Sequence, residues 1–557
     1  MSPIEAELVS SSFHHQGKTY ILHWSRLHQS EKNQWFQSYA TLWSSKALKV
    51  GFHLKPDIKY FISQNIDFQN YYDLMISYYL INPTESNHEP TLEEALRKLC
   101  NLDLTHYKPH SQKQLWGDEE EELSVLCFFP DLYQIINKKF PSQELDSLQK
   151  EIEFPMILVL ADMELQGVSL DLNRFQELEK ELERGIQKLE KEIFDLAGEV
   201  FNINSTQQVA YILFEKLEIH KIVGLKKLKK TKTGYSTDQS VLEDLSSHPL
   251  PRLILEHRKL SKLLNTYIAP LPKWIQKKSG KIHTTFHQAL TATGRLSSSH
   301  PNLQNIPIKS DMGKQIRAAF VPGKKDYLLL SADYSQIELR LLAHFSKDPT
   351  LCQAFLEDQD IHTATAAKLF KVPLNKVTRE MRSRAKAVNF GIIYGMGPKR
   401  LAKSEGLTLT EAKNFIENYF ALYPSIQAYI NKQLERARKD EKVCTLFGRV
   451  RQLEGINSSH ERVRAEMERI AINTPIQGSA ADIIKKSMVQ IYQVLKHKDY
   501  RAQMILQIHD ELVFEVHHQD LQPVKKMVKG IMESVINLEV PLKVDLGWGK
   551  NWLEAHG

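Results

Sequence analysis

The chain has 557 residues, 42% of them apolar and 25% charged, which is an ordinary composition for a globular protein of several domains. Lys and Arg number 73 against 67 Asp and Glu, so the net charge of +6 is only weak evidence for a nucleic-acid partner. No apolar run reaches the roughly 18 residues of a membrane span, no secretory leader is recognisable and the four cysteines are far apart, so we expect a cytoplasmic protein with reduced thiols and no membrane partner.

The first 150 residues carry mixed strand and helix signals. Residues 19–24 are predicted to form a strand, and residues 74–80 and 91–99 are predicted to be helical. The acidic run at 118–122 is interpreted as a solvated loop or helix start rather than a metal site.

Two long helices are predicted next. Apolar residues recur every three or four positions between 175 and 196, with Asp171 or Asn173 as a possible N-cap and Gly198 as a possible end. A second helix, residues 251–266, carries Lys259 and Lys262 and follows a lysine-rich stretch at 226–232. A lysine run alone usually indicates a solvated loop, but two long helices with basic tips could grip phosphates without reading sequence.

Two aspartates each follow an apolar, strand-like run. Asp333 ends the first run, and Ser335 is predicted to cap the helix that begins there. Asp510 lies between two apolar runs, which predicts a hairpin whose turn carries the acid. A lone Asp after a strand is most often a turn or cap residue, whereas two such carboxylates could bridge two Mg²⁺ ions about 4 Å apart in phosphoryl transfer. The backbone carbonyl of Tyr334 could add a ligand.

A basic helix is predicted near residues 382–394. Arg382, Lys386, Phe390 and Tyr394 recur every four residues and therefore share one face. The cations could bind a triphosphate and Phe390 could stack on a base, although the same pattern also suits a helix with solvated cations and a packed Phe. The sequence has no Walker A string and no HExxH, which disfavours a P-loop ATPase or a zinc hydrolase.

These strings together resemble the motifs of family A DNA polymerases, in particular Klenow-type members. The resemblance covers roughly residues 150–557 and rests on Thr-Gly-Arg at 293–295, Pro-Asn-Leu-Gln-Asn at 301–305, Asp-Tyr-Ser-Gln-Ile-Glu at 333–338, the helix at 386–395, the strings at 468–482 and His-Asp-Glu at 509–511. So many ordered matches make chance negligible.

The resemblance implies a multidomain α/β and α+β fold of the right-hand polymerase type. The polymerase domain would be residues 151–557, with the thumb at about 160–285, the palm at about 286–345 and 470–557, and the fingers at about 346–469. The implied activity is DNA-templated addition of dNTPs to a primer 3′-OH with two Mg²⁺ ions, for which Mn²⁺ can substitute. The implied partners are primer–template DNA and dNTPs, bound by a monomer in the bacterial cytosol or nucleoid during replication or repair gap filling. No 5′-nuclease domain is expected.

The resemblance also implies roles for single residues. Asp333 and Asp510, with the Tyr334 carbonyl, would be the metal ligands, Glu511 an auxiliary acid, and Lys386 a candidate proton donor to pyrophosphate. The dNTP-binding residues implied are Arg382, Lys386, Phe390, Tyr394, His362, Glu338, Gln336 and Lys309. The DNA-binding residues implied are Arg295, Asn302, Gln304, Asn305, Asn473, Gln477, His509, Lys259 and Lys262.

Three of these positions imply substrate preferences. Glu338 matches the residue that crowds a ribose 2′-OH and so favours dNTPs. Phe390, as Phe and not Tyr, matches members that reject dideoxynucleotides. Lys309 stands where the family often has Arg, so the charge is kept but bidentate geometry is lost.

The N-terminal part departs from the family pattern. Klenow-type members often carry an RNase H-like α/β domain with 3′–5′ exonuclease activity, four metal-binding acids and a Tyr. Asp57 and Asp131 resemble two of these acids, while Cys127 stands in the place of the Tyr and no Asp-x-Glu string precedes residue 57. We therefore predict that residues 1–150 are a degenerate, inactive exonuclease-like domain and that the protein does not proofread.

Two other functions compete with DNA synthesis. A catalytically silent DNA-binding scaffold is disfavoured because Asp333, Lys386 and Asp510 are all intact. A main activity as a 3′–5′ exonuclease is disfavoured by the missing Asp-x-Glu string.

Overall fold

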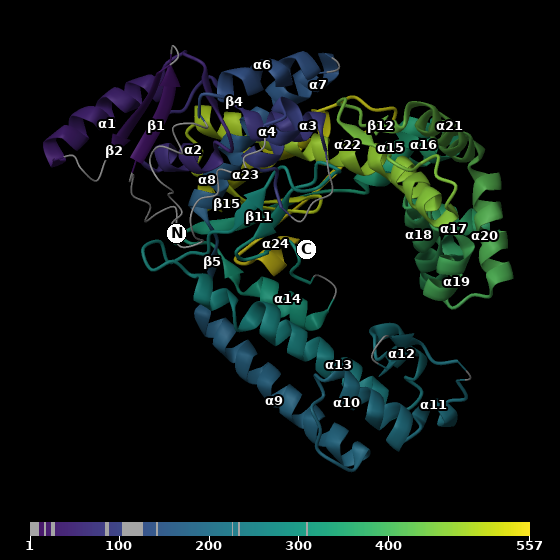
Figure 1. Cartoon of the computed structure of the whole chain (residues 1–557). Coiled ribbons are helices and arrows are strands. Elements are labelled where there is room, and N and C mark those ends of the chain that lie inside the picture. Colours follow the sequence, from purple (N-terminus) through teal and green to yellow (C-terminus); the bar gives the residue numbers. More distant parts are fainter. Residues whose placement is uncertain are drawn as a thin grey trace.

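The computed structural model describes residues 10–15, 18–23, 28–83, 88–102, 126–140, 143–225, 227–231, 234–307 and 310–556. The acidic run at 118–122 and Lys309 lie outside the described residues. A β-sheet stands at the centre, the N-terminal elements pack above it, and two helical arms extend below and to the right (Figure 1). None of the described helices is long and apolar enough to cross a membrane.

The central sheet has four antiparallel strands in the order β14-β15-β11-β16. Its strands are β11 (Tyr327–Tyr334), β14 (Ala502–Ile508), β15 (Glu511–His517) and β16 (Val544–Gly549). The predicted hairpin is confirmed, because β14 and β15 pair on either side of a two-residue turn at 509–510. Leu330, Ala332, Val513 and Phe514 are fully buried, so the sheet is part of the largest hydrophobic core.

Helices from distant parts of the chain pack around this sheet and complete its core. They are α8 (Phe154–Gln166), α14 (Asp311–Ala318), α22 (Glu461–His497), α23 (Leu521–Ser534) and α24 (Trp552–His556). Short strands, a short helix and two hairpins join them: β5 (Ser169–Leu170), β10 (Phe320–Val321), β8 (Thr285–His287), β9 (Ser297–Ser299), η8 (His518–Asp520), β12 (Lys442–Cys444) and β13 (Val450–Gln452).

The first arm is built on the two long helices that the sequence predicts. These are α9 (Leu172–Ala197) and α13 (Pro249–Leu263), which pack along each other. Of the two candidate caps, Asp171 is the N-cap, since its carboxylate accepts from Arg174 N–H, and α9 ends at Gly198 with φ of 71°. The tip has its own core. The other elements of this arm are α10 (Thr206–Ala210), η4 (Tyr211–Lys216), α11 (Ile219–Ile222), β6 (Lys230–Thr231), β7 (Gly234–Tyr235), α12 (Gln239–Asp244), η5 (Leu264–Ile268) and η6 (Leu271–Trp274).

The second arm is helical and begins directly after β11. It consists of α15 (Ile337–Ser346), α16 (Pro349–Leu356), α17 (Ile361–Leu369), η7 (Leu374–Lys376), α18 (Arg379–Ile393), α19 (Pro398–Glu405), α20 (Leu409–Leu422) and α21 (Pro424–Asp440). The predicted basic helix is α18, and Tyr394 lies just beyond its last residue.

The predicted cap at Ser335 is wrong. The N-cap of α15 is Gln336, in the left-handed region with φ of 55°, and no side chain caps this helix. Ser335 N–H instead donates to the Lys543 carbonyl at 2.9 Å, and the Ser335 carbonyl accepts from Arg340 at 2.9 Å. The backbone at Ser335 is thus fixed by hydrogen bonds to Lys543, which precedes β16, and to the buried Arg340, rather than by a local cap.

The N-terminal region confirms the predicted strand and both predicted helices. Its sheets are the antiparallel pair β1 (Ser10–His15) with β2 (Lys18–His23) and the parallel pair β3 (Lys49–Gly51) with β4 (Tyr71–Asp73). Its helices are α1 (Gln29–Ser44), α2 (Lys55–Ser63), α3 (Leu74–Ile81), α4 (Leu92–Cys100), α6 (Phe129–Lys139), α7 (Gln143–Leu148) and η3 (Gln149–Glu153). A separate hydrophobic core is built from the helices of this region together with β3 and β4.

Candidate active site

Asp333 and Asp510 meet at one end of the central sheet. Asp333 is the next-to-last residue of β11, and Asp510 lies in the turn between β14 and β15. The Tyr334 N–H donates to the Asp510 carbonyl at 3.1 Å, which ties the turn to β11. Cross-strand pairing sets Glu511 and Asp545 beside Asp333, so the edge collects carboxylates from three strands and a turn.

This crowding changes the proton affinity of the acids. Burial, together with the charges of Glu511 and Asp510, raises the pKa of Asp333 to about 7. Burial raises the pKa of Asp510 to about 6, and the Arg295 charge opposes that shift. Acids held this close to one another disfavour their own ionisation, and a divalent cation would relieve the repulsion.

The donors at this edge suit a hard cation. Mg²⁺ prefers oxygen ligands and needs only one or two carboxylates when water and substrate phosphates complete its shell. Within the described ranges, no three or more His, Cys, Asp or Glu side chains converge as a metal-binding group. Asp333 and Asp510 could therefore hold an ion only together with ligands such as the Tyr334 carbonyl, water or substrate.

Glu511 is anchored by neighbours rather than free in the site. Its Oε1 accepts from Ser331 Oγ at 2.7 Å and from Trp552 Nε1 at 2.9 Å, and it lies 3.3 Å from His556 Nδ1. Arg317 stacks on the Trp552 ring, with its guanidinium carbon 3.9 Å from the ring centroid. The Nη1 atom of Arg317 also lies 3.6 Å from Glu511 Oε2. These contacts lower the pKa of Glu511, although burial alone would raise it.

Sequence reasoning missed the groups that surround the two aspartates. Arg317, Trp552 and His556 orient Glu511 from α14 and α24. Asp545 sits directly across from Asp333 on β16, where its charge helps raise the pKa of Asp333. The sequence signal that could have indicated Asp545 is its position as a charged residue between the apolar Val544 and Leu546 of a strand-like run.

Arg295, Glu338 and Tyr394 form a hydrogen-bonded trio near Asp510. Arg295 Nη2 donates to Glu338 Oε1 at 2.5 Å, and Tyr394 Oη donates to Glu338 Oε2 at 2.9 Å. Glu338 is only 5% exposed. Burial and the Glu338 charge raise the pKa of Tyr394, which keeps its hydroxyl protonated as a donor. Three residues that the sequence predicts for the site, from separate segments, are thus brought into contact.

The predicted nucleotide helix presents its cations with different partners. Arg382 binds Asp360 through Nε at 3.0 Å and Nη2 at 2.7 Å, in a pair about two-fifths exposed on both sides. Lys386 is exposed, and its Nζ lies 6.0 Å from the centroid of the Phe390 ring. An exposed pair such as Arg382 and Asp360 contributes at most about 1 kcal/mol, so Arg382 can exchange its partner at little cost.

His362 lies buried behind this helix. Asn389 Nδ2 lies 3.0 Å from His362 Nδ1, and the His362 ring centroid is 5.7 Å from that of Phe390. Burial lowers the pKa of His362 to about 4, helped by the charges of Lys386 and Arg382. A neutral ring accepting at Nδ1 keeps its proton on Nε2, where it can donate. The sequence predicts His362 but gave no sign of Asn389.

The predicted DNA-binding residues line two adjoining cavities. One cavity of about 260 Å³ runs from Arg295 to Asp510 and includes Asn302, Gln304, Asn305 and His509. A second, of about 610 Å³, shares three of these residues and extends to Lys259 and Lys262 on α13. Lys259 and Lys262 of the first arm and Asp510 of the sheet end therefore line neighbouring cavities.

Asn473 and Gln477 occupy α22 one turn apart, on the helical face that continues to Ala481 and Lys485. Ala481 and Lys485 line the smaller cavity, whereas the two predicted residues are not among its lining residues. Gln336, by contrast, is the left-handed residue between β11 and α15, with φ of 55°.

The two proposed exonuclease remnants are exposed residues on different helices. Asp57 lies in the first turn of α2 and Asp131 in the first turn of α6, and Cys127 is also exposed. The lysines that flank Asp57 in α2 are both bonded to Glu164 of α8, at 2.7 Å from Lys55 and 2.5 Å from Lys59. This part of α2 is thus anchored to the core helix α8.

Comparison with known proteins identifies related chains. The family model for DNA polymerase family A matches residues 172–554. The DNA polymerase I of Caldicellulosiruptor bescii is 44% identical over 488 residues, which cover 87% of this chain and 55% of that protein. The DNA polymerase I of Bacillus subtilis is 47% identical over 409 residues, 73% of this chain and 46% of that protein.

A solved structure also matches nearly the whole chain. The polymerase domain of Pol1 from M. smegmatis, in complex with DNA primer-template and dNTP, superposes with a TM-score of 0.89 at 33% identity. The match covers 99% of this chain and 93% of that one. The chain spans about half the length of the curated relatives it matches.

Proposed function

The chain belongs to DNA polymerase family A, and we propose that it is a DNA-directed DNA polymerase that extends a primer 3′-OH with dNTPs. The observation that carries the proposal is the meeting of Asp333 and Asp510 at one sheet end, beside Arg295 and Glu338. The M. smegmatis relative was solved with DNA primer-template and dNTP, which supports the same partners for this chain.

Asp333 and Asp510 would hold two Mg²⁺ ions, with the Tyr334 carbonyl as a further ligand. The bound ions would favour deprotonation of the primer 3′-OH and neutralise charge on the leaving pyrophosphate. Glu511 stays in its anchored position and keeps the local field negative, since its Oε1 already accepts from Ser331 and Trp552 and its Oε2 faces Arg317.

The face of α18 would bind the nucleotide. Lys386 is exposed and can approach the triphosphate, where it could also protonate the leaving group. Arg382 would exchange Asp360 for a phosphate, and His362 could donate from Nε2. Phe390 offers a ring for the base.

The same geometry supports a preference for deoxynucleotides. Glu338 is held on one side by Arg295 and on the other by Tyr394, so its carboxylate cannot easily move aside. A fixed carboxylate there would crowd a ribose 2′-OH. Phe390 lacks the hydroxyl of a Tyr, and by the family resemblance this would favour rejection of dideoxynucleotides.

We further propose that this chain does not proofread. Asp57 and Asp131 are exposed on separate helices, and neither has an acidic Asp-x-Glu partner from the preceding sequence. Desolvation by the surrounding protein and the charge of Asp73 raise the pKa of Asp57 to about 6, whereas Asp131 lies on a different helix, so the two remnants do not supply the four acids that the resemblance requires.

The test is to replace each candidate metal ligand by its isosteric amide. Asp333→Asn and Asp510→Asn should each lower primer extension by more than about 100-fold, beyond the effect usual for groups that only orient metal ligands. The affinity for primer–template, measured by fluorescence anisotropy, should stay within about threefold, since many phosphate contacts remain. Asp520→Asn is the matched control, because Asp520 pairs with Arg501 at the surface. Full extension by either active-site variant would overturn the assignment, and binding without extension by the unmodified protein would indicate a silent scaffold.

A further inference from the structure

Arg295 lies in the loop between β8 and β9, residues 288–296. Side chains of the N-terminal region contact this loop and the end of β8 at three points. The Phe286 carbonyl accepts from Lys55 Nζ, and Phe286 N–H donates to Glu164 at 2.9 Å. Lys55 therefore binds both the first strand of this hairpin and the helix α8 beneath it. The hairpin is fixed at its start by a residue more than 200 positions earlier in the chain.

Glu89 makes the second attachment. Its carboxylate lies 2.9 Å from His287 Nδ1 and accepts from the backbone N–H groups of Gln288 at 3.0 Å and Ala289 at 3.1 Å. Glu89 thus caps three consecutive residues of the loop with one side chain.

Tyr79 makes the third attachment and comes nearest to Arg295. Its hydroxyl donates to the Thr291 carbonyl at 2.6 Å, and Thr291 Oγ1 donates to the Arg295 carbonyl at 2.7 Å. Tyr79 is 1% exposed, and burial raises its pKa to about 12, so the hydroxyl remains a donor at neutral pH. Two hydrogen bonds therefore connect an N-terminal side chain to the backbone of Arg295.

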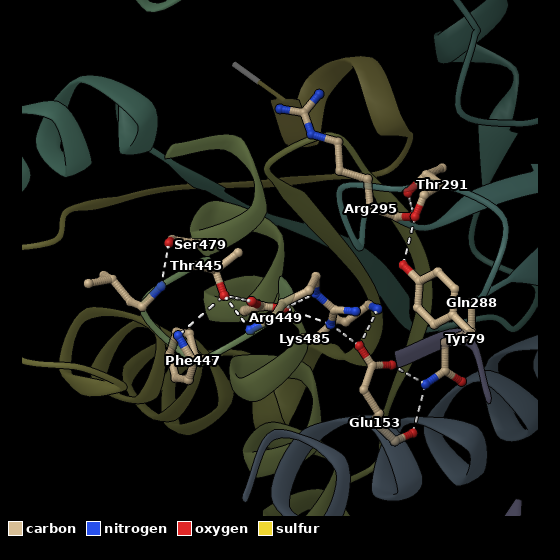
Figure 2. Close-up of polar contacts among 12 residues, drawn as sticks. Tyr79, Glu153, Gln288, Thr291, Arg295, Thr445, Phe447, Arg449, Ser479 and Lys485 are labelled. Atoms are coloured by element: carbon tan, nitrogen blue, oxygen red, sulfur yellow. Dashed lines mark hydrogen bonds and ion pairs between the residues drawn. The ribbon is translucent and has the colours of Figure 1, made fainter. Parts of the chain in front are cut away.

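A buried ion cluster also supports this loop, and it lies beside Tyr79, whose ring centroid is 5.8 Å from the guanidinium carbon of Arg449. Glu153 accepts from Lys485 Nζ at 2.8 Å and from Arg449, and Arg449 also binds Asp482 at 2.7 Å. The cluster holds two cations and two anions, all nearly inaccessible to solvent. Figure 2 shows Gln288 reaching Glu153, Tyr79 reaching Thr291, and the Arg295 side chain pointing away from the cluster.

Gly294 is where the cluster touches the loop. Its φ is +80°, and a Cβ there would lie 2.5 Å from Arg449 Nε. The loop backbone immediately before Arg295 therefore rests against the Arg449 guanidinium. The backbone at Arg295 is thus constrained by the hydrogen bonds from Tyr79 through Thr291 and by the contact of Gly294 with Arg449.

We propose that Tyr79 is a positioning residue for Arg295, and that the N-terminal region thereby sets the alignment of the primer terminus. The inference rests on the proposed function. Arg295 already contacts Glu338, and it lines the same cavity as Asp510. A small displacement of its backbone would move the guanidinium relative to both, and misplacement of a positioning group far from the chemistry lowers the rate of the step it aligns.

The experiment is a double-mutant cycle on the full chain. Tyr79→Phe removes one hydroxyl, and Arg295→Ala removes the side chain that Tyr79 is proposed to position. Tyr78→Phe is the matched control, because Tyr78 is also buried in α3 but its hydroxyl accepts from Asn82 of the same segment. Single-nucleotide incorporation gives kcat and KM for the dNTP, and a melting curve confirms that each variant is folded.

Tyr79→Phe should lower kcat about three- to tenfold with the dNTP KM nearly unchanged, as expected when one buried hydrogen bond that aligns a group is lost. On the Arg295→Ala background the same change should lower kcat by less than about twofold, because the group to be positioned is gone. Tyr78→Phe should leave kcat unchanged.

An equal loss on both backgrounds, or no loss from Tyr79→Phe in the unmodified background, would overturn the inference. Failure of the unmodified protein to extend any primer would instead overturn the proposed function.

Discussion

Single carboxylates in this molecule have very different proton affinities because their neighbours differ. Asp333 and Asp510 face other acids, which together with burial raises the pKa of Asp333 to about 7 and of Asp510 to about 6. Glu89 is also largely buried, yet its pKa falls to about 2, because His287, Lys55 and the Ala289 N–H outweigh the effect of burial. Asp333 and Asp510 are therefore suited to binding a cation, whereas the charge of Glu89 is already compensated by groups within the fold.

Glu89 therefore gives a stability prediction with a definite sign. A pKa depressed in the folded state contributes stability above the ordinary value of 4.5, and that stability is lost as pH falls toward 2. Glu89→Gln should lower the free energy of unfolding at pH 7 by about 1–3 kcal/mol, the usual cost of disrupting a buried charged hydrogen-bond group. The difference in the free energy of unfolding between the unmodified protein and Glu89→Gln, measured by urea unfolding, should be smaller at pH 4 than at pH 7. Glu93→Gln, an exposed change in the next helix, serves as the control. A gap that is equal or larger at pH 4 would contradict this account.

Elements with strong local signals were predictable from sequence, and those fixed by distant partners were not. The stripe and caps of α9 and the apolar runs around Asp510 are local, so that helix and the hairpin were predicted correctly. The residue type and position of Ser335 predict a helix cap. In the structure its N–H instead donates to the carbonyl of Lys543, more than 200 residues later in the chain. Asp545 reaches Asp333 only through strand pairing, which periodicity within one segment does not reveal.

The turn before Arg295 is an element whose conformation depends on one glycine. Gly294→Ala would place a methyl group 2.5 Å from Arg449 Nε in a backbone region with φ of +80°. We expect a loss of about 1–3 kcal/mol in the free energy of unfolding, from left-handed strain together with displacement of a buried cation. Primer extension should fall as well, because Arg295 is the next residue.

Gly530→Ala is the matched control for this prediction. Gly530 lies in α23, and a Cβ there meets no atom within 4 Å, so alanine should be neutral or stabilising by up to about 1 kcal/mol. If Gly294→Ala unfolds at the same denaturant concentration as the unmodified protein, Arg449 does not constrain the turn as described.

At the scale of the whole molecule, the N-terminal region and the polymerase part are joined through buried charge. Glu153, from the N-terminal side, shares a cluster with Arg449, Asp482 and Lys485 of the later chain. Removing one member of such a cluster leaves an unpaired buried charge, which is strongly destabilising. The N-terminal region therefore contributes to the core and to the loop that carries Arg295.

The domain plan and the roles of single residues follow from the resemblance rather than from local pattern. The family is established, because the polymerase family A model matches residues 172–554. The packing of the N-terminal region against the β8–β9 loop could not be predicted, since Tyr79 and Glu89 stand in segments with no recognisable motif.

The most direct measurement is extension of a labelled primer on a DNA template with Mg²⁺, with and without dNTPs, beside the Asp510→Asn variant. The account predicts extension by the unmodified protein only when dNTPs and Mg²⁺ are both present, no extension by the variant, and a primer of unchanged length when dNTPs are absent. Equal extension by the variant, or no extension by the unmodified protein, would contradict the assignment of DNA synthesis to Asp333 and Asp510. Shortening of the primer without dNTPs would contradict the proposed loss of proofreading.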